Sequence, residues 1–286
     1  MSPVRLLPGG AVVIGAANGI GAATARRLAA AGVPLLLADV EREPLDALGR
    51  ALGGPTHGVH VWTVDVRDAA SLDRLRNESL ARLGRLHAVV NCAAVLRPAG
   101  LLDAALDDIW EQVDVNLTGT ILVARAFVPH LAAQGGGHLV NIASLGGLVP
   151  LPGSVVYSAT KFGVRGFSLA LALEAARHGV AVSVICPDSA DTRQLRAEAR
   201  HADSALSFTS APLAADDVAR AVVRTLRHPR REVLVPGPRG ALIRLLVVFP
   251  NLFARLVPLL TWLGRRGQRR YQARHTDASG LQEVHA

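Results

Sequence analysis

The chain has 286 residues, half of them apolar, which is enough for one large α/β domain or two small ones with a sizeable core. Its net charge of +8 is unevenly spread: residues 224–274 hold twelve arginines and one acid, whereas the rest holds 19 basic and 22 acidic side chains. The main part of the chain therefore lacks the basic character of a nucleic-acid-binding protein, and we expect no nucleic-acid partner.

The two cysteines and the first residues bear on the compartment. Cys92 and Cys186 lie in apolar, strand-like runs without metal-ligand spacing, so we expect no metal site and a reduced, cytoplasmic state. Residues 1–7 contain no long apolar run, and we expect no secretory signal.

The first element is a short apolar run at residues 11–15, followed by a glycine-rich turn and a helix that ends at Gly32. Glycines in this context let the backbone approach a pyrophosphate, and the helix N-terminus offers free N–H groups. A turn built from glycines for packing alone is the alternative. The predicted phosphate-binding residues are Gly15, Ala17, Asn18, Gly19, Ile20 and Gly21.

A second buried strand is predicted at residues 34–39 and ends at Asp39. A carboxylate at this place can accept hydrogen bonds from both adenosine ribose hydroxyls and would repel a 2′-phosphate, so NAD is favoured over NADP. The alternative is that Asp39 caps a helix at residues 43–52.

The pattern continues with a strand at residues 59–66, a helix at 69–83 and a strand at 86–94 that runs into small residues. Asp65 and Val66 would lie near the adenine, and Asn91 and Ala93 beside the cofactor. Residues 103–134 are predicted to be one helix. Asn116 lies inside it, where it either lines the active site or faces solvent.

The second half repeats the alternation of strands and helices. Strands are predicted at residues 138–144, 180–186 and 232–235. A helix that carries Tyr157 and Lys161 is predicted to run to residue 178, a second helix covers residues 216–228, and residues 187–210 form a polar segment. This order indicates an α/β protein with a doubly wound parallel sheet. Ligands bind beyond the carboxyl ends of the strands in such sheets, where Ser144 and Pro187 fall.

Tyr157 and Lys161 form the chemically most informative pair. Lys161 is the only lysine, and the other thirty basic side chains are arginine. Four residues apart on a helix, the two share a face, and a nearby ammonium group would lower the pKa of the phenol and favour proton transfer. A solvated helix face with this spacing by chance is the alternative.

Together these motifs resemble the short-chain dehydrogenase/reductase family over residues 9–237. The glycine motif T-G-x-x-x-G-x-G is matched from Ile14 to Gly21, with Ile14 replacing threonine, and N-N-A-G is matched loosely by residues 91–94. The P-G-x-x-x-T segment corresponds to residues 187–192, with Asp188 in place of glycine. The resemblance implies a three-layer Rossmann fold with seven parallel strands.

The resemblance also implies roles. Tyr157 would be the general acid/base, Ser144 would orient the substrate oxygen, and Lys161 would lower the tyrosine pKa and hold the nicotinamide ribose. Asn116 would hold a water in a proton relay, and Pro187 and Thr192 would lie against the nicotinamide end. Asp188 would add a charge there.

Residues 238–286 extend beyond the region of resemblance, so we expect two parts, residues 1–237 and 238–286. The segment 240–264 is strongly apolar, but Arg244 and Arg255 interrupt it and Pro250 and Pro258 are expected to break it. Its longest uncharged run is ten residues, too short for a transmembrane helix. Residues 240–270 would either bind a membrane surface or cover the protein's own cleft or a subunit contact.

The functional expectation is an NAD(P)-dependent oxidoreductase, with NAD favoured, that interconverts a lipophilic secondary alcohol and its ketone. A dinucleotide-binding or membrane-associated protein with little catalysis is the alternative. The family resemblance implies a homodimer or homotetramer. We expect a cytoplasmic protein, peripheral on the membrane if the extension binds lipid, with residues from Thr276 onward frayed.

Overall fold

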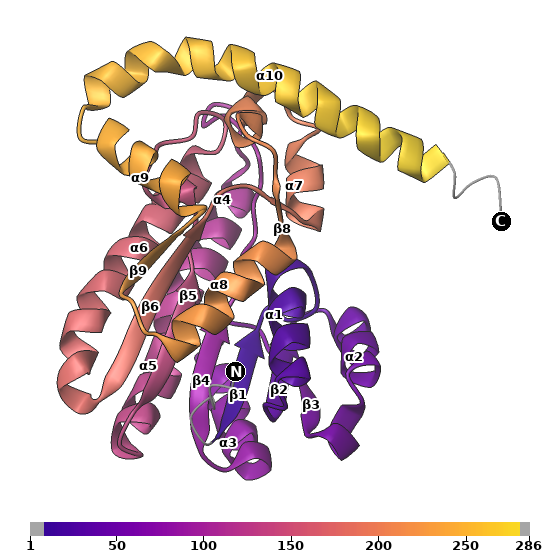
Figure 1. Ribbon diagram of the computed structural model, residues 1–286, viewed down its shortest axis with the longest axis vertical. Coiled ribbons are helices and arrows are strands. Elements are labelled where there is room, and N and C mark those ends of the chain that lie inside the picture. Colours follow the sequence, from indigo (N-terminus) through magenta and orange to yellow (C-terminus); the bar gives the residue numbers. More distant parts are fainter. Residues whose placement is uncertain (1–8, 281–286) are drawn as a thin grey trace.

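The computed structural model describes residues 9–280 (Figure 1). The strands are β1 (Gly10–Ile14), β2 (Leu35–Asp39), β3 (Val59–Thr63), β4 (Leu86–Asn91), β5 (Gly137–Ile142), β6 (Val180–Pro187), β7 (Ala190–Asp191), β8 (Leu213–Ala214) and β9 (Glu232–Val235). The α-helices are α1 (Gly19–Ala30), α2 (Arg42–Ala51), α3 (Ala69–Leu83), α4 (Leu106–Gln112), α5 (Gly119–Ala133), α6 (Val155–Ala175), α7 (Arg193–Glu198), α8 (Ala215–Arg227), α9 (Gly237–Leu246) and α10 (Pro250–Gly280). Short helices of other types are η1 (Gly54–His57), η2 (Val113–Thr118), η3 (Leu145–Gly147), η4 (Ala176–His178) and η5 (Ala202–Phe208).

Seven strands form one parallel sheet in the order β3-β2-β1-β4-β5-β6-β9. β1 pairs with both β2 and β4. From β1 the strands follow outward in chain order in both directions, through β2 and β3 on one side and through β4, β5, β6 and β9 on the other. This confirms the predicted doubly wound Rossmann architecture. Because every strand is parallel, all carboxyl ends lie along one edge of the sheet, and that edge is where a ligand crevice forms.

Helices cover both faces of the sheet, as expected for parallel strands that are apolar on both sides. One face carries α1, α2 and α8, with Leu28, Leu45 and Val222 in its core. The other carries α3, α5 and α6, with Leu72 and Phe127 in its core. Burying each such side chain contributes about 1.5–3 kcal/mol, so the two cores hold the sheet rigid beneath the site.

Three predicted boundaries were wrong. The strands predicted to reach Val66 and Ala94 end at Thr63 and Asn91. The helix predicted from residue 103 starts at Leu106, where Asp107 and Asp108 favour the helix N-terminus, and it is interrupted by the π-helical turn η2 that contains Asn116. Leu106–Ala133 is long and apolar enough to span a membrane, with a mean hydropathy of 1.2, but it is a core helix of the sheet layer.

The segment after β6 is more ordered than its polar sequence indicated. It contains the short parallel pair β7–β8, the helix α7 and the 3-10 helix η5. Thr192 caps α7 by accepting a hydrogen bond from Leu195 N.

The extension forms two helices. The break predicted at Pro250 is confirmed, because α10 begins at that residue. The break predicted at Pro258 is wrong, because Pro258 lies inside α10. Packing explains the continuity: Gly264 lies so close to η5 that a Cβ there would overlap Ala205 O. Beyond it, the ring of Tyr271 packs 5.3 Å from that of Phe208, and the Tyr271 hydroxyl donates to Asp191 at 2.6 Å.

α10 crosses the edge of the sheet that carries the strand carboxyl ends (Figure 1). The helix continues through Gly280, and residues 281–286 lie outside the described residues, so the frayed end expected from Thr276 stays a prediction. Residues 1–7, for which we expect no secretory signal, also lie outside the described residues. The predicted boundary between residues 237 and 238 falls at the start of α9.

Candidate active site

The glycine turn between β1 and α1 forms one end of a large cavity. Gly15 has a φ of +74°, and a Cβ there would lie 2.6 Å from Ala93 N; a Cβ on Gly21 would overlap Gly15 O. No side chain caps α1, because Asn18 donates to Glu41 instead. This bare turn with an open helix N-terminus fits a pyrophosphate, and Gly15, Asn18, Gly19, Ile20 and Gly21 line the cavity.

Asp39 lies at the carboxyl end of β2 and braces the turn. Its carboxylate accepts hydrogen bonds from Ala17 N at 2.8 Å and Glu41 N at 3.0 Å, and it lines the cavity. Ala17 itself does not line the cavity and acts through this contact. Asp39 is therefore not a cap of α2, whose N-cap is Glu41.

Two predicted asparagines position backbone and do not line the cavity. Asn91 accepts from Ala93 N at 3.2 Å and donates to Thr120. Asn116 is fully buried; it accepts from Val95 N and donates to Val95 O, both at 2.8 Å, and donates to Thr160. Both amide hydrogens of Asn116 are thus bonded within the protein. Asn116 holds Val95, in the loop after β4, and Val95 lines the cavity.

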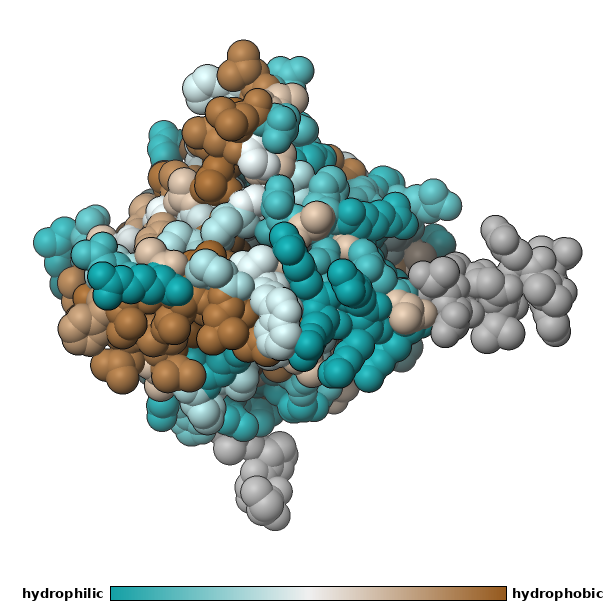
Figure 2. All heavy atoms as spheres, turned by 90° about the horizontal axis from the view of Figure 1, so that it is seen from above, coloured by the Kyte–Doolittle hydropathy of each residue, from teal (hydrophilic) through white to brown (hydrophobic). Residues whose placement is uncertain are grey.

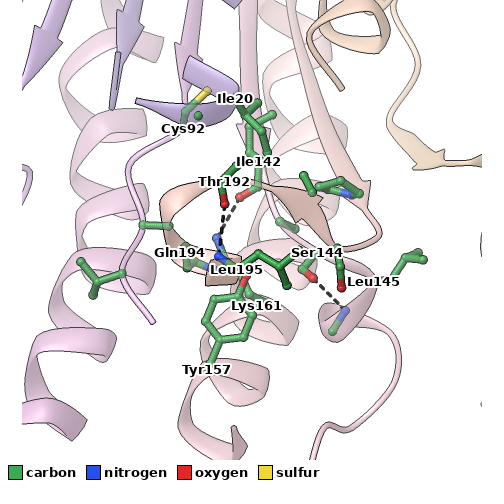
Figure 3. Close-up of a pocket in the computed structure, with 18 of the residues that line it drawn as sticks. Ile20, Cys92, Ile142, Ser144, Leu145, Tyr157, Lys161, Thr192, Gln194 and Leu195 are labelled. Atoms are coloured by element: carbon green, nitrogen blue, oxygen red, sulfur yellow. Dashed lines mark hydrogen bonds between the residues drawn. The ribbon is translucent and has the colours of Figure 1, made fainter. Parts of the chain in front are cut away.

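Ser144, Tyr157 and Lys161 converge at the other end of the cavity (Figure 3). Ser144 follows β5, and its hydroxyl accepts from Gly146 N at 3.0 Å. Tyr157 and Lys161 project from α6; the ammonium group lies 5.6 Å from the centre of the tyrosine ring and donates to Ile142 O at 3.0 Å. Lys161 is 2% exposed, which excludes the solvated helix face as its explanation.

Burial dominates the protonation of this group. It raises the pKa of Tyr157 well above its ordinary value, and the charge of Glu198 acts in the same direction, while hydrogen bonding to Gln194 and Ser144 opposes them. Burial thus outweighs the groups that lower the tyrosine pKa, and the lowering expected from Lys161 stays a prediction. Burial also lowers the pKa of Lys161 to about 8, which weakens the ammonium charge available to the phenol.

The remaining predicted residues lie along the cavity between these ends. Val66, Ala93 and Pro187 line it, as does Thr192, whose methyl group faces Gly19. Asp65 also lines it, but its carboxylate is paired with Arg67 at 2.7 Å, which lowers its pKa. Asp65 therefore faces the cavity as a carboxylate paired with Arg67, and its contact with the adenine stays a prediction.

The sequence led us to expect that residues 189–212 shape the pocket, but not that a helix there forms the roof of the site. α7 brings Gln194, Leu195 and Glu198 to the cavity (Figure 3), and Arg193 at its start pairs with Glu41 across the cavity wall. Glu198 is buried, which raises its pKa, and it accepts from Ser207 at 2.9 Å. The signal was a threonine N-cap followed by good helix formers, R-Q-L-R-A-E.

The extension also lines the cavity, which has a volume of about 510 Å³. Leu242, Ile243 and Leu246 contribute from α9, and Phe253, Leu260 and Leu263 from α10. The tail thus covers the cleft, one of the two alternatives left open by the sequence. The reactive groups lie between a polar crevice and this apolar wall.

Comparisons with known proteins settle the family. Residues 10–203 match the short chain dehydrogenase family. The chain is a short-chain dehydrogenase. It is 39% identical over 177 residues to a D-threitol dehydrogenase from Mycolicibacterium smegmatis, covering 62% of this chain and 68% of that protein. It is 37% identical over 185 residues to the 1-deoxy-11-beta-hydroxypentalenate dehydrogenase of Streptomyces exfoliatus, covering 64% and 67%.

Solved structures agree. A short-chain dehydrogenase/reductase from Burkholderia phymatum in complex with NAD superposes with a TM-score of 0.75 at 27% identity, covering 84% of this chain and 93% of that one. The short-chain dehydrogenase described here is therefore an NAD(P)-dependent oxidoreductase that acts on alcohols, which confirms the predicted enzyme class.

Asp188, a departure from the family pattern, is explained by the extension. Arg239 of α9 pairs with it, with Nε 2.5 Å from Asp188 Oδ2 although not aligned as a hydrogen bond, and Ser210 donates to the same oxygen at 2.8 Å. Arg239 also donates to Thr209. The added negative charge is thus neutralised and used to attach the tail to the end of β6. The other departure, Ile14, is fully buried in the core at the end of β1.

Proposed function

We propose that this short-chain dehydrogenase uses NAD to interconvert a lipophilic secondary alcohol and its ketone. The observation that carries the proposal is the apolar wall supplied by α9 and α10 to the cavity that holds Tyr157 and Ser144. Aliphatic and aromatic side chains on that wall match a substrate whose body is hydrocarbon and whose reactive oxygen is the polar end.

The chain's own groups handle the proton. Bound NAD(H) supplies a hydride acceptor or donor at its nicotinamide ring. Tyr157, protonated at neutral pH because burial raises its pKa, donates its phenolic proton to the carbonyl oxygen during reduction and must receive a proton during oxidation. Ser144 places a hydroxyl beside the same oxygen. Lys161, anchored on Ile142 O, presents its positive charge beneath the phenol and favours the phenolate that oxidation requires.

Charges around the adenosine end support NAD over NADP. Asp39 and Glu41 place carboxylates where a 2′-phosphate would otherwise lie. The nearby arginines are engaged elsewhere: Arg42 bonds Asp46 at 2.7 Å, and Arg193 is paired with Glu41. A 2′-phosphate would thus meet two arginines that are already paired and the Asp39 carboxylate, which is held by backbone N–H groups.

A substrate panel tests the proposal. Steroid, retinoid, fatty and terpenoid secondary alcohols are assayed for NADH formation, with D-threitol as a polar alcohol of the kind named for one relative, and each is repeated with NADP. We expect kcat/KM to be at least tenfold higher for the lipophilic alcohols and for NAD. Preference for the polyol would refute the substrate class, and preference for NADP would refute the cofactor assignment.

A matched pair of variants sharpens the cofactor test. Asp39→Ser removes the carboxylate, and Glu43→Ser removes an exposed acid on the adjoining helix that does not line the cavity. Asp39→Ser should raise KM for NAD and lower the preference for NAD over NADP, whereas Glu43→Ser should change neither the KM nor the preference. Equal effects would show that the preference does not come from Asp39.

We also propose a homodimer or homotetramer formed through α5 and α6. Large apolar side chains are exposed there, namely Ile121, Phe162 and Leu173. Light scattering on the purified chain tests this, and a monomer at assay concentration would contradict it.

A further inference from the structure

The outer face of the extension is a large apolar surface. We call the α9–α10 apolar surface the set of exposed side chains on α9, α10 and the turn between them; their exposed fractions run from 44% to 64%. Figure 2 shows the corresponding brown area at its left. The members are Leu242, Leu245, Val248, Phe249, Leu252, Leu259, Trp262 and Leu263. A contiguous apolar area of this kind marks an interaction site.

The same helix carries a cluster of cations. Arg255, Arg265, Arg266, Arg269, Arg270 and Arg274 are exposed on α10. None of the six forms an ion pair among the side chains that the structure describes, and Arg266 stacks 3.7 Å from the Trp262 ring centre. Hydrophilic residues correspondingly cover the part of Figure 2 towards the C-terminus. Apolar and cationic side chains thus adjoin along one helix.

The surface is connected to the cavity. Leu242 and Leu263 line the cavity and are also 57% and 44% exposed, so the α9–α10 apolar surface and the cavity wall share side chains. Phe253 and Leu260 lie on the cavity side of α10, while Leu252 and Leu259 lie exposed. The N-terminal half of α10 is therefore apolar towards the cavity and towards the outside.

We propose that the α9–α10 apolar surface binds an anionic lipid bilayer, with α10 lying in the interface, and that a lipophilic substrate enters the cavity between the two helices from the lipid. Apolar side chains with Trp262 suit the acyl boundary, and unpaired arginines suit anionic headgroups. A second copy of the chain fits less well, because residues 237–275 of that copy hold arginines and no acidic side chain to pair with them. The entry route rests on the proposed function, whereas bilayer binding does not.

Vesicle co-sedimentation of the full chain, without cofactor, tests the binding. Vesicles of phosphatidylcholine alone are compared with vesicles containing one third phosphatidylglycerol. We expect binding to the anionic vesicles that weakens at least tenfold between 0.05 M and 0.5 M salt, because the charges are screened. Equal binding to both vesicle types, or no binding to either, overturns the proposal.

Two variant sets separate this surface from generic stickiness. The set Leu245→Ser, Phe249→Ser and Leu252→Ser alters exposed side chains that do not line the cavity. The control set Leu101→Ser, Leu102→Ser and Leu106→Ser alters side chains elsewhere that are at least as exposed, at 63%, 99% and 71%. Vesicle affinity should fall at least tenfold for the first set only. A shift of oligomeric state in place of vesicle affinity for the first set would identify a second copy as the occupant and overturn the proposal.

A charge set completes the test. Arg265→Gln, Arg269→Gln and Arg270→Gln should lower affinity for anionic vesicles by about a hundredfold, at about 1 kcal/mol for each arginine near an anionic surface. Arg224→Gln, Arg227→Gln and Arg230→Gln are the control, since α8 ends and β9 begins at the sheet edge opposite the strand carboxyl ends. Equal losses for both sets would show attraction by net charge alone and refute docking through α10.

The entry route has its own readout. With a vesicle-embedded alcohol, the Leu245, Phe249 and Leu252 variants should raise KM at least fivefold and leave kcat and KM for a detergent-solubilised short alcohol unchanged. If vesicle binding holds but KM for the embedded alcohol does not change, the route is wrong while the docking stands. If no alcohol is turned over at all, the proposed function fails and the sedimentation result still decides the docking.

Discussion

The ion pair between Asp188 and Arg239 is expected to couple the extension to the catalytic domain. The Asp188 side chain is only 12% exposed, and that of Arg239 is 31% exposed. Removing one partner of a buried pair costs about 3–5 kcal/mol, and the partial exposure of Arg239 reduces this to about 2 kcal/mol. Arg239→Met retains an apolar stem. It leaves the Asp188 carboxylate with two hydrogen-bond donors, the Ser210 hydroxyl and the backbone N–H of Ser189.

A double-mutant cycle measures this coupling. The free energy of unfolding in urea is determined for Arg239→Met, Asp188→Asn and the double variant, and we expect a coupling energy of about 1.5–2 kcal/mol. The exposed pair Arg82–Glu78, at 40% and 34% exposure, is the matched control and should give no more than about 0.5 kcal/mol. A coupling energy for Asp188 and Arg239 no larger than that of the control would refute the argument that the family's glycine is replaced here in order to hold the tail.

Three further outcomes follow from buried groups. Burial lowers the pKa of His138 to about 4, so the native state binds fewer protons than the unfolded state between about pH 6.5 and 4. The free energy of unfolding should therefore fall by about 3 kcal/mol as the pH drops through this window. His138→Gln, measured by urea unfolding at each pH, should make the free energy of unfolding less dependent on pH. Gly264→Ala places a methyl group against Ala205 O, and we expect the Tm to fall by several degrees. Gly166→Ala is the control, because a methyl group there meets open space and should leave the Tm unchanged or higher. Equal Tm values for the two variants would contradict the close docking of α10. Because burial raises the pKa of Tyr157, kcat for alcohol oxidation should rise with pH above neutrality while kcat for ketone reduction does not, and a pH-independent oxidation rate would contradict a phenolic proton acceptor.

The sequence predicted the sheet well because the strands are short, largely apolar runs, and most of them end at or next to a glycine, proline or polar residue. The helix α3 was predicted with its observed bounds, since Asp68 caps it and Gly84 follows it. The strand ends likewise brought Ser144 and Asp39 to one edge. These features are local, and a periodic pattern is sufficient to identify them.

The rest depended on contacts between distant segments. Pro258 lies inside α10, which is held against η5, about fifty residues before it in the chain. The role of Asp188 depended on Arg239, and the protonation of Tyr157 depended on its burial and on Glu198 and Gln194 of α7. Asn116 was correctly singled out as a polar residue that needs a reason, but its bidentate bond to Val95 is a tertiary contact that spacing does not reveal.

The measurement that tests the account most directly compares wild type with Tyr157→Phe for NADH binding and for turnover of the best alcohol in the panel. The phenol is 7% exposed, and its ring would be retained, so NADH should bind with an unchanged Kd while turnover falls by about a hundredfold or more. Turnover that survives the loss of the hydroxyl, with binding intact, would contradict the assignment of Tyr157 as the proton-transfer group.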